Sequence, residues 1–99
     1  MAIRHLVLLR FADDTPADTR RDIETAFAAL PQQIDGITAF EWGTDVSPEG
    51  LAKGFTHAFA VSFADAAARD AYLPHPAHQA FVARLRPCLA DVLVFDYTV

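Results

Sequence analysis

The sequence predicts an α+β fold of ferredoxin-like topology, βαββαβ, whose four-stranded antiparallel sheet carries its helices on one face. Three observations predict it. Four segments have the alternating pattern or composition of strands, two regions place apolar residues at helical spacing, and the two types follow one another in this order along 99 residues. A chain of this length makes one small domain, so residues 1–99 are assigned to a single domain.

The first strand is expected over Ile3–Phe11, where side chains alternate between two faces. One face is apolar apart from a histidine and carries Ile3, His5, Val7, Leu9 and Phe11. The other has leucines at its centre and arginines at both ends: Arg4, Leu6, Leu8 and Arg10. Because both faces are apolar in the middle, we expect this strand to be covered on both sides.

The first helix is expected to begin with Thr15 as its N-cap and Pro16 as its first residue. Its buried stripe follows the spacing i, i+3, i+4 and i+7, through Ile23, Ala26, Phe27 and Leu30. Pro31 is expected to end the helix, because proline lacks the N–H that a continuing helix needs.

Two further strands are expected over Thr38–Val46 and Phe55–Phe63. The earlier strand carries Phe40 and Trp42 on one face, which we interpret as core or dimer-face packing. The later strand places His57 on an apolar face that is shared with Phe55, Phe59, Val61 and Phe63.

A break between two prolines divides the second helical region. Asp65 should cap a short helix that runs to about Tyr72, and Pro76 should begin the next. His75 is expected to lie extended at the break, partly exposed. The following stripe contains His78, Phe81, Val82, Leu85 and Leu89, and Pro87 should kink or end the helix.

The last strand is expected over Asp91–Val99, with two alternating faces. Asp96 shares a face with Val94, and we expect it to form an ion pair with Arg4 or Arg10 across the sheet. The sheet face without helices stays largely apolar, and an apolar patch of that kind marks an interaction surface. We therefore expect a homodimer that pairs these faces.

Charge and cysteine content exclude several classes of protein. The net charge is −5, and the eight lysines and arginines form no cluster, so neither nucleic acid nor an anionic membrane surface is an expected partner. No apolar run is long enough to cross a membrane. The single cysteine, Cys88, fits a reducing compartment, and a cytoplasmic location is expected.

His5, Tyr72 and His78 are the candidate functional side chains, because they are set among apolar neighbours. Burying a polar group without a partner costs ~1–3 kcal/mol, so these groups either bond one another in a structural network or line a cavity for a ligand. A continuous cavity of ~300 Å³ or more that reaches all three favours the ligand. The rest of its expected lining is Val7, Leu9, Phe27, His57, Phe59 and Phe81.

Proton transfer next to a carbonyl is the chemistry that such a cavity supports. His78 would act as general base, His5 would orient His78 or donate to the enolate oxygen, and Tyr72 would hold a carbonyl or phenol oxygen. No metal is expected, because Pro76 keeps His75 and His78 off one helix face and no cysteine completes a site. No Gly-rich phosphate loop is present, and no cofactor is expected.

Several motifs resemble those of the stress-responsive A/B barrel (Dabb) family. They are the first strand Ile3–Phe11, Trp42-Gly43-Thr44-Asp45-Val46-Ser47, Gly54-Phe55-Thr56-His57-Ala58, Tyr72-Leu73-Pro74-His75-Pro76-Ala77-His78 and Val94-Phe95-Asp96-Tyr97. The resemblance covers essentially the whole chain and implies a dimeric α+β barrel.

The family's best-understood member is a plant polyketide cyclase that promotes an aldol condensation with two histidines and a tyrosine. The resemblance implies these roles for His5, His78 and Tyr72, and a small hydrophobic carbonyl or polyketide-like ligand. A tyrosine of the family's first helix is matched here by Phe27, which cannot hydrogen-bond a substrate. Other members look like stress-associated proteins, which implies the alternative of a non-catalytic structural or ligand-binding dimer.

Overall fold

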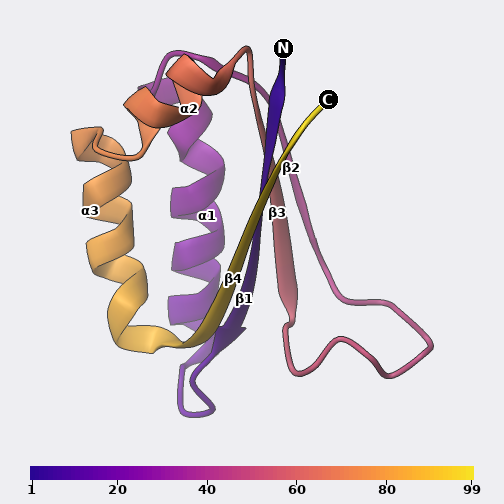
Figure 1. Ribbon diagram of the computed structural model, residues 1–99. Helices are drawn as coiled ribbons and strands as arrows, with labels where there is room; N and C mark the ends of the chain where they lie inside the picture. The colour runs from indigo at the N-terminus through magenta and orange to yellow at the C-terminus, as the bar shows by residue number, and fades with distance from the viewer.

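The computed structural model describes residues 1–99, and its elements follow the expected order. All helices lie on one face of the sheet (Figure 1). The second helical region is divided in two, as the prolines predicted. The elements are β1 (Ile3–Phe11), α1 (Ala17–Gln33), β2 (Ile37–Thr44), β3 (His57–Phe63), α2 (Ala66–Tyr72), α3 (Pro76–Leu85), a 3-10 turn (Arg86–Cys88) and β4 (Leu89–Thr98).

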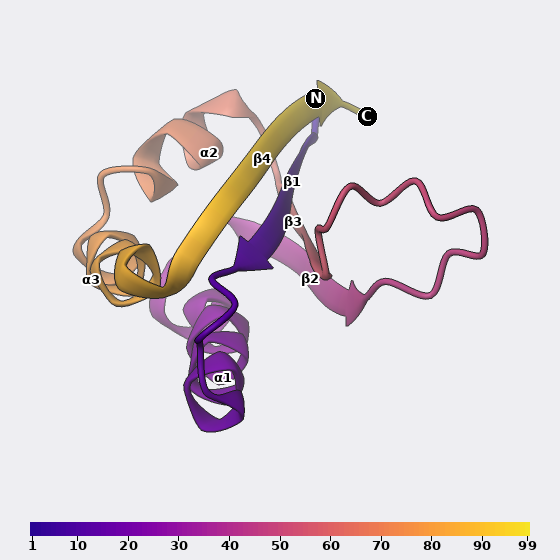
Figure 2. The ribbon, with the colours of Figure 1, turned by 90° about the horizontal axis from the view of Figure 1, so that it is seen from below.

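The sheet is antiparallel, in the order β2-β3-β1-β4, so β1 lies in its interior. The ferredoxin-like α+β fold is thereby confirmed. Seen from below, α1 and α3 lie beside each other on the same side of the sheet (Figure 2). The register places His5 opposite Asp96 of β4 and opposite Val61 of β3. Directly opposed residues point to the same face, so these three side chains face the helices.

The core lies between β1, β3 and the helices. All five alternate residues of β1 that face the helices are buried, and the aromatic rings of α1, β3 and α3 meet above them. Phe27 stacks on Phe59 with centroids 4.2 Å apart and lies 4.7 Å from Phe81. Burying one such ring contributes about 1.5–3 kcal/mol, so this cluster fixes α1 and α3 on the sheet.

Both expected ends of the first helix are wrong. The N-cap is Pro16, and the buried Thr15 instead donates from its hydroxyl to the Cys88 carbonyl at 3.4 Å. Pro31 lies inside the helix, which continues to Gln33. A proline so close to the end removes one hydrogen bond while the next turn still forms, since the Ile34 N–H donates to the Leu30 carbonyl.

Other boundaries differ by a few residues. β2 begins at Ile37 and ends at Thr44, and β3 begins at His57, because Phe55 belongs to a turn in which its N–H donates to the Ala52 carbonyl. Pro87 is followed by strand rather than helix, so Leu89 begins β4 and is not part of the α3 stripe.

The helix-free face exposes a row of large apolar side chains on β4. Leu93, Phe95 and Tyr97 are 43%, 59% and 40% exposed, and they pair with Leu8, Leu6 and Arg4 of β1. Trp42 does not belong to this face, because it stacks on His57 and Phe59 on the helix side. None of the helices has the length and apolar content needed to cross a membrane.

Candidate functional site

His5, Asp96 and Arg69 form a chain of hydrogen bonds at one end of the sheet. The strand register brings Asp96 beside His5, and the His5 Nδ1–H donates to Asp96 Oδ1 at 2.6 Å. From α2, Arg69 Nη1 donates to Asp96 Oδ2 at 2.8 Å. The expected ion pair of Asp96 with Arg4 or Arg10 is therefore wrong. Those arginines alternate onto the helix-free face, whereas Asp96 faces the helices.

Two donors hold the Asp96 carboxyl group in its charged form. Burial works against ionisation, but the hydrogen bonds from His5 and Arg69 outweigh it, and the pKa of Asp96 lies below its usual value. The carboxylate can only accept, so it fixes the proton of His5 on Nδ1. His5 Nε2 has no partner in the protein, and the residue borders a cavity.

The break between α2 and α3 is built by side chains that cap both helices. Asp65 accepts the Ala68 N–H at 2.8 Å and begins α2. His75 is the N-cap of α3, and its Nδ1 accepts the Ala77 N–H at 3.0 Å. His75 is half-buried and extended, so the expectation of a partly exposed residue at the break holds. Its imidazole is committed to the cap.

His78 lies in the first turn of α3 with its ring held by the break. Its Nδ1–H donates to the Leu73 carbonyl at 2.9 Å. Burial lowers the pKa of His78, and the neighbouring His5 and His75 lower it further, against the opposing effect of that hydrogen bond. The ring is therefore neutral at neutral pH, and Nε2 carries its lone pair.

Tyr72 contacts both histidines. Its ring centroid lies 5.9 Å from that of His5 and 4.3 Å from that of His78. Burial raises the pKa of Tyr72, so the hydroxyl stays protonated. It makes no hydrogen bond within the protein. Every side-chain polar atom that is sealed from solvent does have a partner, so the Tyr72 hydroxyl is open to the adjoining space.

That space is a cavity of about 300 Å³ between the sheet and helices α2 and α3. It has the size of a small-molecule site and reaches His5, Tyr72 and His78 together. Apolar side chains make up most of the wall, and the residues around it are His5, Val7, Phe27, Tyr72, Leu73, His78, Phe81, Val82, Leu85, Arg86, Leu89, Val92 and Val94.

Six of the nine expected site residues border the cavity: His5, Val7, Phe27, Tyr72, His78 and Phe81. Leu9, His57 and Phe59 do not, which corrects their placement in its lining. The reason is that Phe27 covers Phe59, and that Leu9 and His57 lie opposite each other near the other end of β1.

His57 belongs to a separate hydrogen-bonded network. Its Nε2–H donates to Glu24 Oε2 of α1 at 2.7 Å, and its Nδ1 accepts from the Thr56 hydroxyl at 2.7 Å. Trp42 stacks on the ring with centroids 5.9 Å apart and planes 7° from parallel. Both nitrogens are satisfied, so this buried histidine ties α1 to β3.

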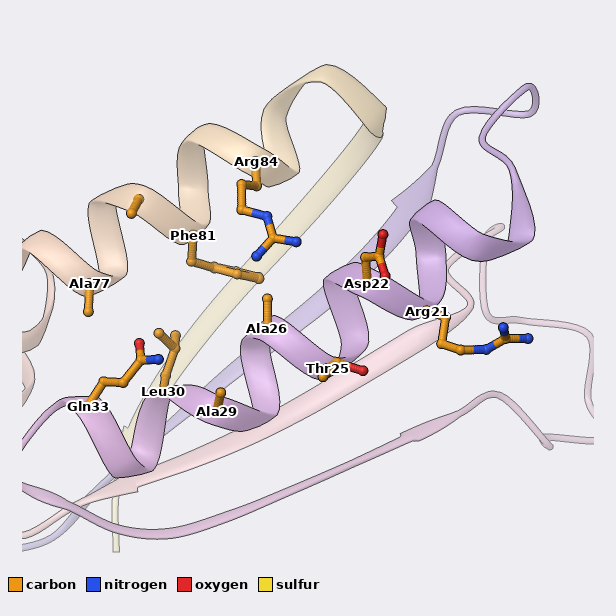
Figure 3. A pocket seen from close by; sticks show the side chains of 11 residues that line it. Arg21, Asp22, Thr25, Ala26, Ala29, Leu30, Gln33, Ala77, Phe81 and Arg84 are labelled. Carbon is orange, nitrogen blue, oxygen red and sulfur yellow. The ribbon is translucent and has the colours of Figure 1, made fainter.

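A second hollow, of about 390 Å³, lies between α1 and α3 (Figure 3). Phe81 borders both this groove and the cavity, whereas Arg84 reaches from α3 toward α1 and takes no part in the cavity. No group of three or more His, Cys, Asp or Glu side chains is placed to hold a metal ion.

The fold and the cavity define a small α+β protein of ferredoxin-like topology with a ligand-sized space between sheet and helices. Its sequence matches the family model of the Stress responsive A/B Barrel Domain, Dabb, over residues 3–99. The chain belongs to the Dabb family.

Relatives of this chain include named enzymes and dimers. Olivetolic acid cyclase from Cannabis sativa is 31% identical over 99% of this chain and 97% of its own. The structure of hydroxynitrile lyase from Passiflora edulis has a TM-score of 0.93 at 25% identity, covering 99% of this chain and 93% of the lyase. A dimeric ferredoxin-like protein of unknown function from Thermobifida fusca has a TM-score of 0.84 at 31% identity, covering 100% and 92%.

Proposed function

We propose that this protein binds a small hydrophobic carbonyl compound in the cavity and removes a proton next to the carbonyl, leading to an aldol-type cyclisation. One observation carries the proposal: a neutral histidine with a free Nε2, a protonated tyrosine hydroxyl and a carboxylate-bound histidine border a single cavity of about 300 Å³. The cyclase and the lyase among the relatives also support this proposal.

His78 is the proposed general base. Its Nδ1–H is used by the Leu73 carbonyl, so only Nε2 is available to accept the proton from carbon. The lowered pKa keeps this nitrogen unprotonated at neutral pH. The C–H bond breaks, the proton passes to Nε2, and the carbanion attacks a second carbonyl of the same molecule. The proton then returns to the new alkoxide.

Tyr72 and His5 are the proposed partners of the carbonyl oxygen. The Tyr72 hydroxyl, protonated because burial raises its pKa, donates to the oxygen on which enolate charge develops. His5 presents Nε2 from the opposite wall, and Asp96 fixes its orientation through Nδ1. A proton carried on His5 Nε2 would be donated to the enolate oxygen, while Nδ1 stays bound to Asp96.

We also propose that the protein is a homodimer that pairs its helix-free sheet faces. Leu93 and Phe95 of β4, with the leucines of β1 beside them, give an apolar surface on this face. Exposed apolar surface of this extent marks an interface more often than a free surface. The Thermobifida fusca relative is described as dimeric, which supports a dimer, and the choice of face rests on the apolar surface.

Cyclisation of heptane-2,4,6-trione to 5-methylresorcinol, with loss of one water, tests the proposed reaction. The wild type should accelerate it, and His78→Gln should reduce kcat/KM roughly 100-fold or more, since a positioned base contributes that much. Tyr72→Phe should cost a similar factor. His75→Asn is the matched control, because asparagine retains a capping side chain but removes an imidazole three residues away. A His78→Gln protein that is folded and as fast as wild type would contradict the assignment.

The second candidate function is a non-catalytic stress-responsive dimer whose histidines are structural. One observation favours it: His5 and His57 each share a hydrogen bond with a carboxylate, which is how buried histidines are commonly satisfied. In that case the wild type would not accelerate the cyclisation at all, while His5→Ala would still lower the free energy of unfolding.

A further inference from the structure

The cavity is polar at one end, apolar along its length and charged at the other end. His5, Tyr72 and His78 form the polar end. His78 is in the first turn of α3, and Arg86 follows its last residue, Leu85. Eight residues of helical rise separate them by ~12 Å. The walls between the two ends are apolar, from Phe81, Val82 and Leu85 on the helix side to Val94 on the sheet side.

Arg86 is the only arginine, lysine or acidic side chain on the cavity wall, and it has no partner in the protein. The five ion pairs of the molecule involve other cations. No side-chain hydrogen bond uses its guanidinium, no carboxylate borders the cavity, and the residue is exposed to solvent. A guanidinium in this state is free to bind a carboxylate through two parallel hydrogen bonds.

We infer that the ligand is an amphipathic carboxylate: an apolar chain or ring with a carbonyl at one end and an anionic carboxylate at the other. This inference rests on the function proposed above. It assigns the carbonyl group to the end formed by His5, Tyr72 and His78, and the carboxylate to Arg86. The separation of the two ends fixes the direction of binding, and it excludes short keto acids that cannot reach both.

A carboxylate fits this end better than a phosphate ester. Arg86 supplies one positive charge, and no other arginine or lysine borders the cavity. The chain as a whole carries a net charge of −5, which repels a dianion more strongly than a monoanion. One guanidinium fork matches one carboxylate in both charge and geometry.

The probes that test this are 8-oxononanoate and its neutral counterpart 8-oxononanamide, which differ only at the group expected beside Arg86. Their dissociation constants are measured by NMR titration, following the backbone amides of Tyr72, His78 and Arg86. The wild type should bind the carboxylate roughly tenfold more tightly than the amide, the gain typical of a charge-assisted hydrogen bond. Arg86→Gln should abolish this preference by weakening carboxylate binding alone.

Arg84→Gln is the matched control, because it removes the same charge two residues earlier, in the last turn of α3, at a residue that faces the α1–α3 groove (Figure 3). It should leave both dissociation constants unchanged. Equal binding of both probes by the wild type, or a preference that survives Arg86→Gln, would overturn the inference while leaving the carbonyl-binding function in place. If neither probe shifts the amides of Tyr72 and His78, carbonyl binding itself fails, and the inference fails with it.

Discussion

His5 and Arg69 bind opposite oxygens of the same carboxylate. His5 Nδ1 lies 2.6 Å from Asp96 Oδ1, and Arg69 Nη1 lies 2.8 Å from Asp96 Oδ2. His5 belongs to β1, Arg69 to α2 and Asp96 to β4. The Asp96 side chain therefore joins the first and the last strand to a helix. The same carboxylate decides which nitrogen of His5 faces the cavity.

Asp96→Ala should lower the free energy of unfolding by about 1–3 kcal/mol at neutral pH, because the buried His5 Nδ1–H loses its acceptor. Urea denaturation followed by circular dichroism measures this. Asp70→Ala is the control, since the exposed Asp70 binds Arg69 from the solvent side and should contribute little. Equal stability losses in the two variants would contradict a special role for Asp96.

The same residue should give the protein an acid-sensitive component of stability. The folded-state pKa of Asp96 lies below its unfolded value, so its contribution is complete above pH ~3.9 and is lost as the pH falls through the folded pKa. Asp96→Asn cannot titrate there. The difference in unfolding free energy between wild type and Asp96→Asn should therefore shrink as the pH falls below ~3.9. A difference that stays constant as the pH falls well below ~3.9 would contradict the lowered pKa.

His78 should add a second pH dependence, nearer neutrality. Its pKa is lower in the folded protein than the unperturbed ~6.5, so below that pH the unfolded chain takes up the proton first and stability falls. Above pH ~6.5 the His78 ring is neutral in both the folded and the unfolded state, so its effect on stability vanishes. His78→Gln should flatten this part of the wild-type profile. As the pH is raised, kcat/KM should likewise rise with a midpoint below pH ~6.5. A midpoint above that pH would argue against His78 as the base.

Strand faces could be predicted from the sequence, whereas most side-chain partners could not. Alternation alone put His5 and His57 on the buried faces of their strands, and the prolines alone placed the break before His78. The partner of His5 depends on the register between β1 and β4, which joins residues 91 positions apart. No local pattern fixes that register, so Asp96 was assigned to arginines of the wrong face.

The extent of the cavity also could not be predicted from local sequence patterns. Leu9, Phe59 and His57 share the helix side of the sheet with Val7 and His5, and alternation cannot separate them. The packing of Phe27 against Phe59 makes that separation, and it depends on where α1 crosses the sheet. Glu24 lies outside the predicted buried stripe of its helix, yet its carboxylate reaches the buried His57.

Phe95→Asp should convert a dimer to a monomer. Phe95 is 59% exposed on the helix-free face, and a charge there would have to be buried without a partner in the proposed interface. Sedimentation velocity at micromolar concentration should show twice the 10.8 kDa chain mass for the wild type and the single mass for the variant. Thr25→Asp, an equal charge change on the exposed side of α1, should remain dimeric. A monomeric wild type would rule out the proposed dimer.

Glu24→Ala should weaken the fold without slowing cyclisation. It removes the acceptor of the buried His57 Nε2–H, which should cost about 1–3 kcal/mol of unfolding free energy. The His57 ring does not border the cavity, so kcat/KM should stay within a factor of about two of wild type once the protein is folded. Asp22→Ala, on the exposed face of the same helix, provides the baseline for stability. A large loss of activity at unchanged fold would connect this network to the cavity.

Phe27→Tyr should strengthen carbonyl binding, because it places a hydroxyl on the cavity wall where the chain has only a hydrocarbon ring. Phe27 borders the cavity, and its ring centroid lies 4.2 Å from that of Phe59 and 4.7 Å from that of Phe81. Because these neighbours hold the ring, the added oxygen has a fixed position. A hydrogen bond to a ligand oxygen should tighten binding of 8-oxononanamide roughly two- to tenfold. Phe27→Leu is the control that changes packing without adding a polar group. If the tyrosine variant lost about 2 kcal/mol or more of stability and bound the probe no better, its hydroxyl would be buried in the aromatic cluster, and Phe27 would be core rather than cavity wall.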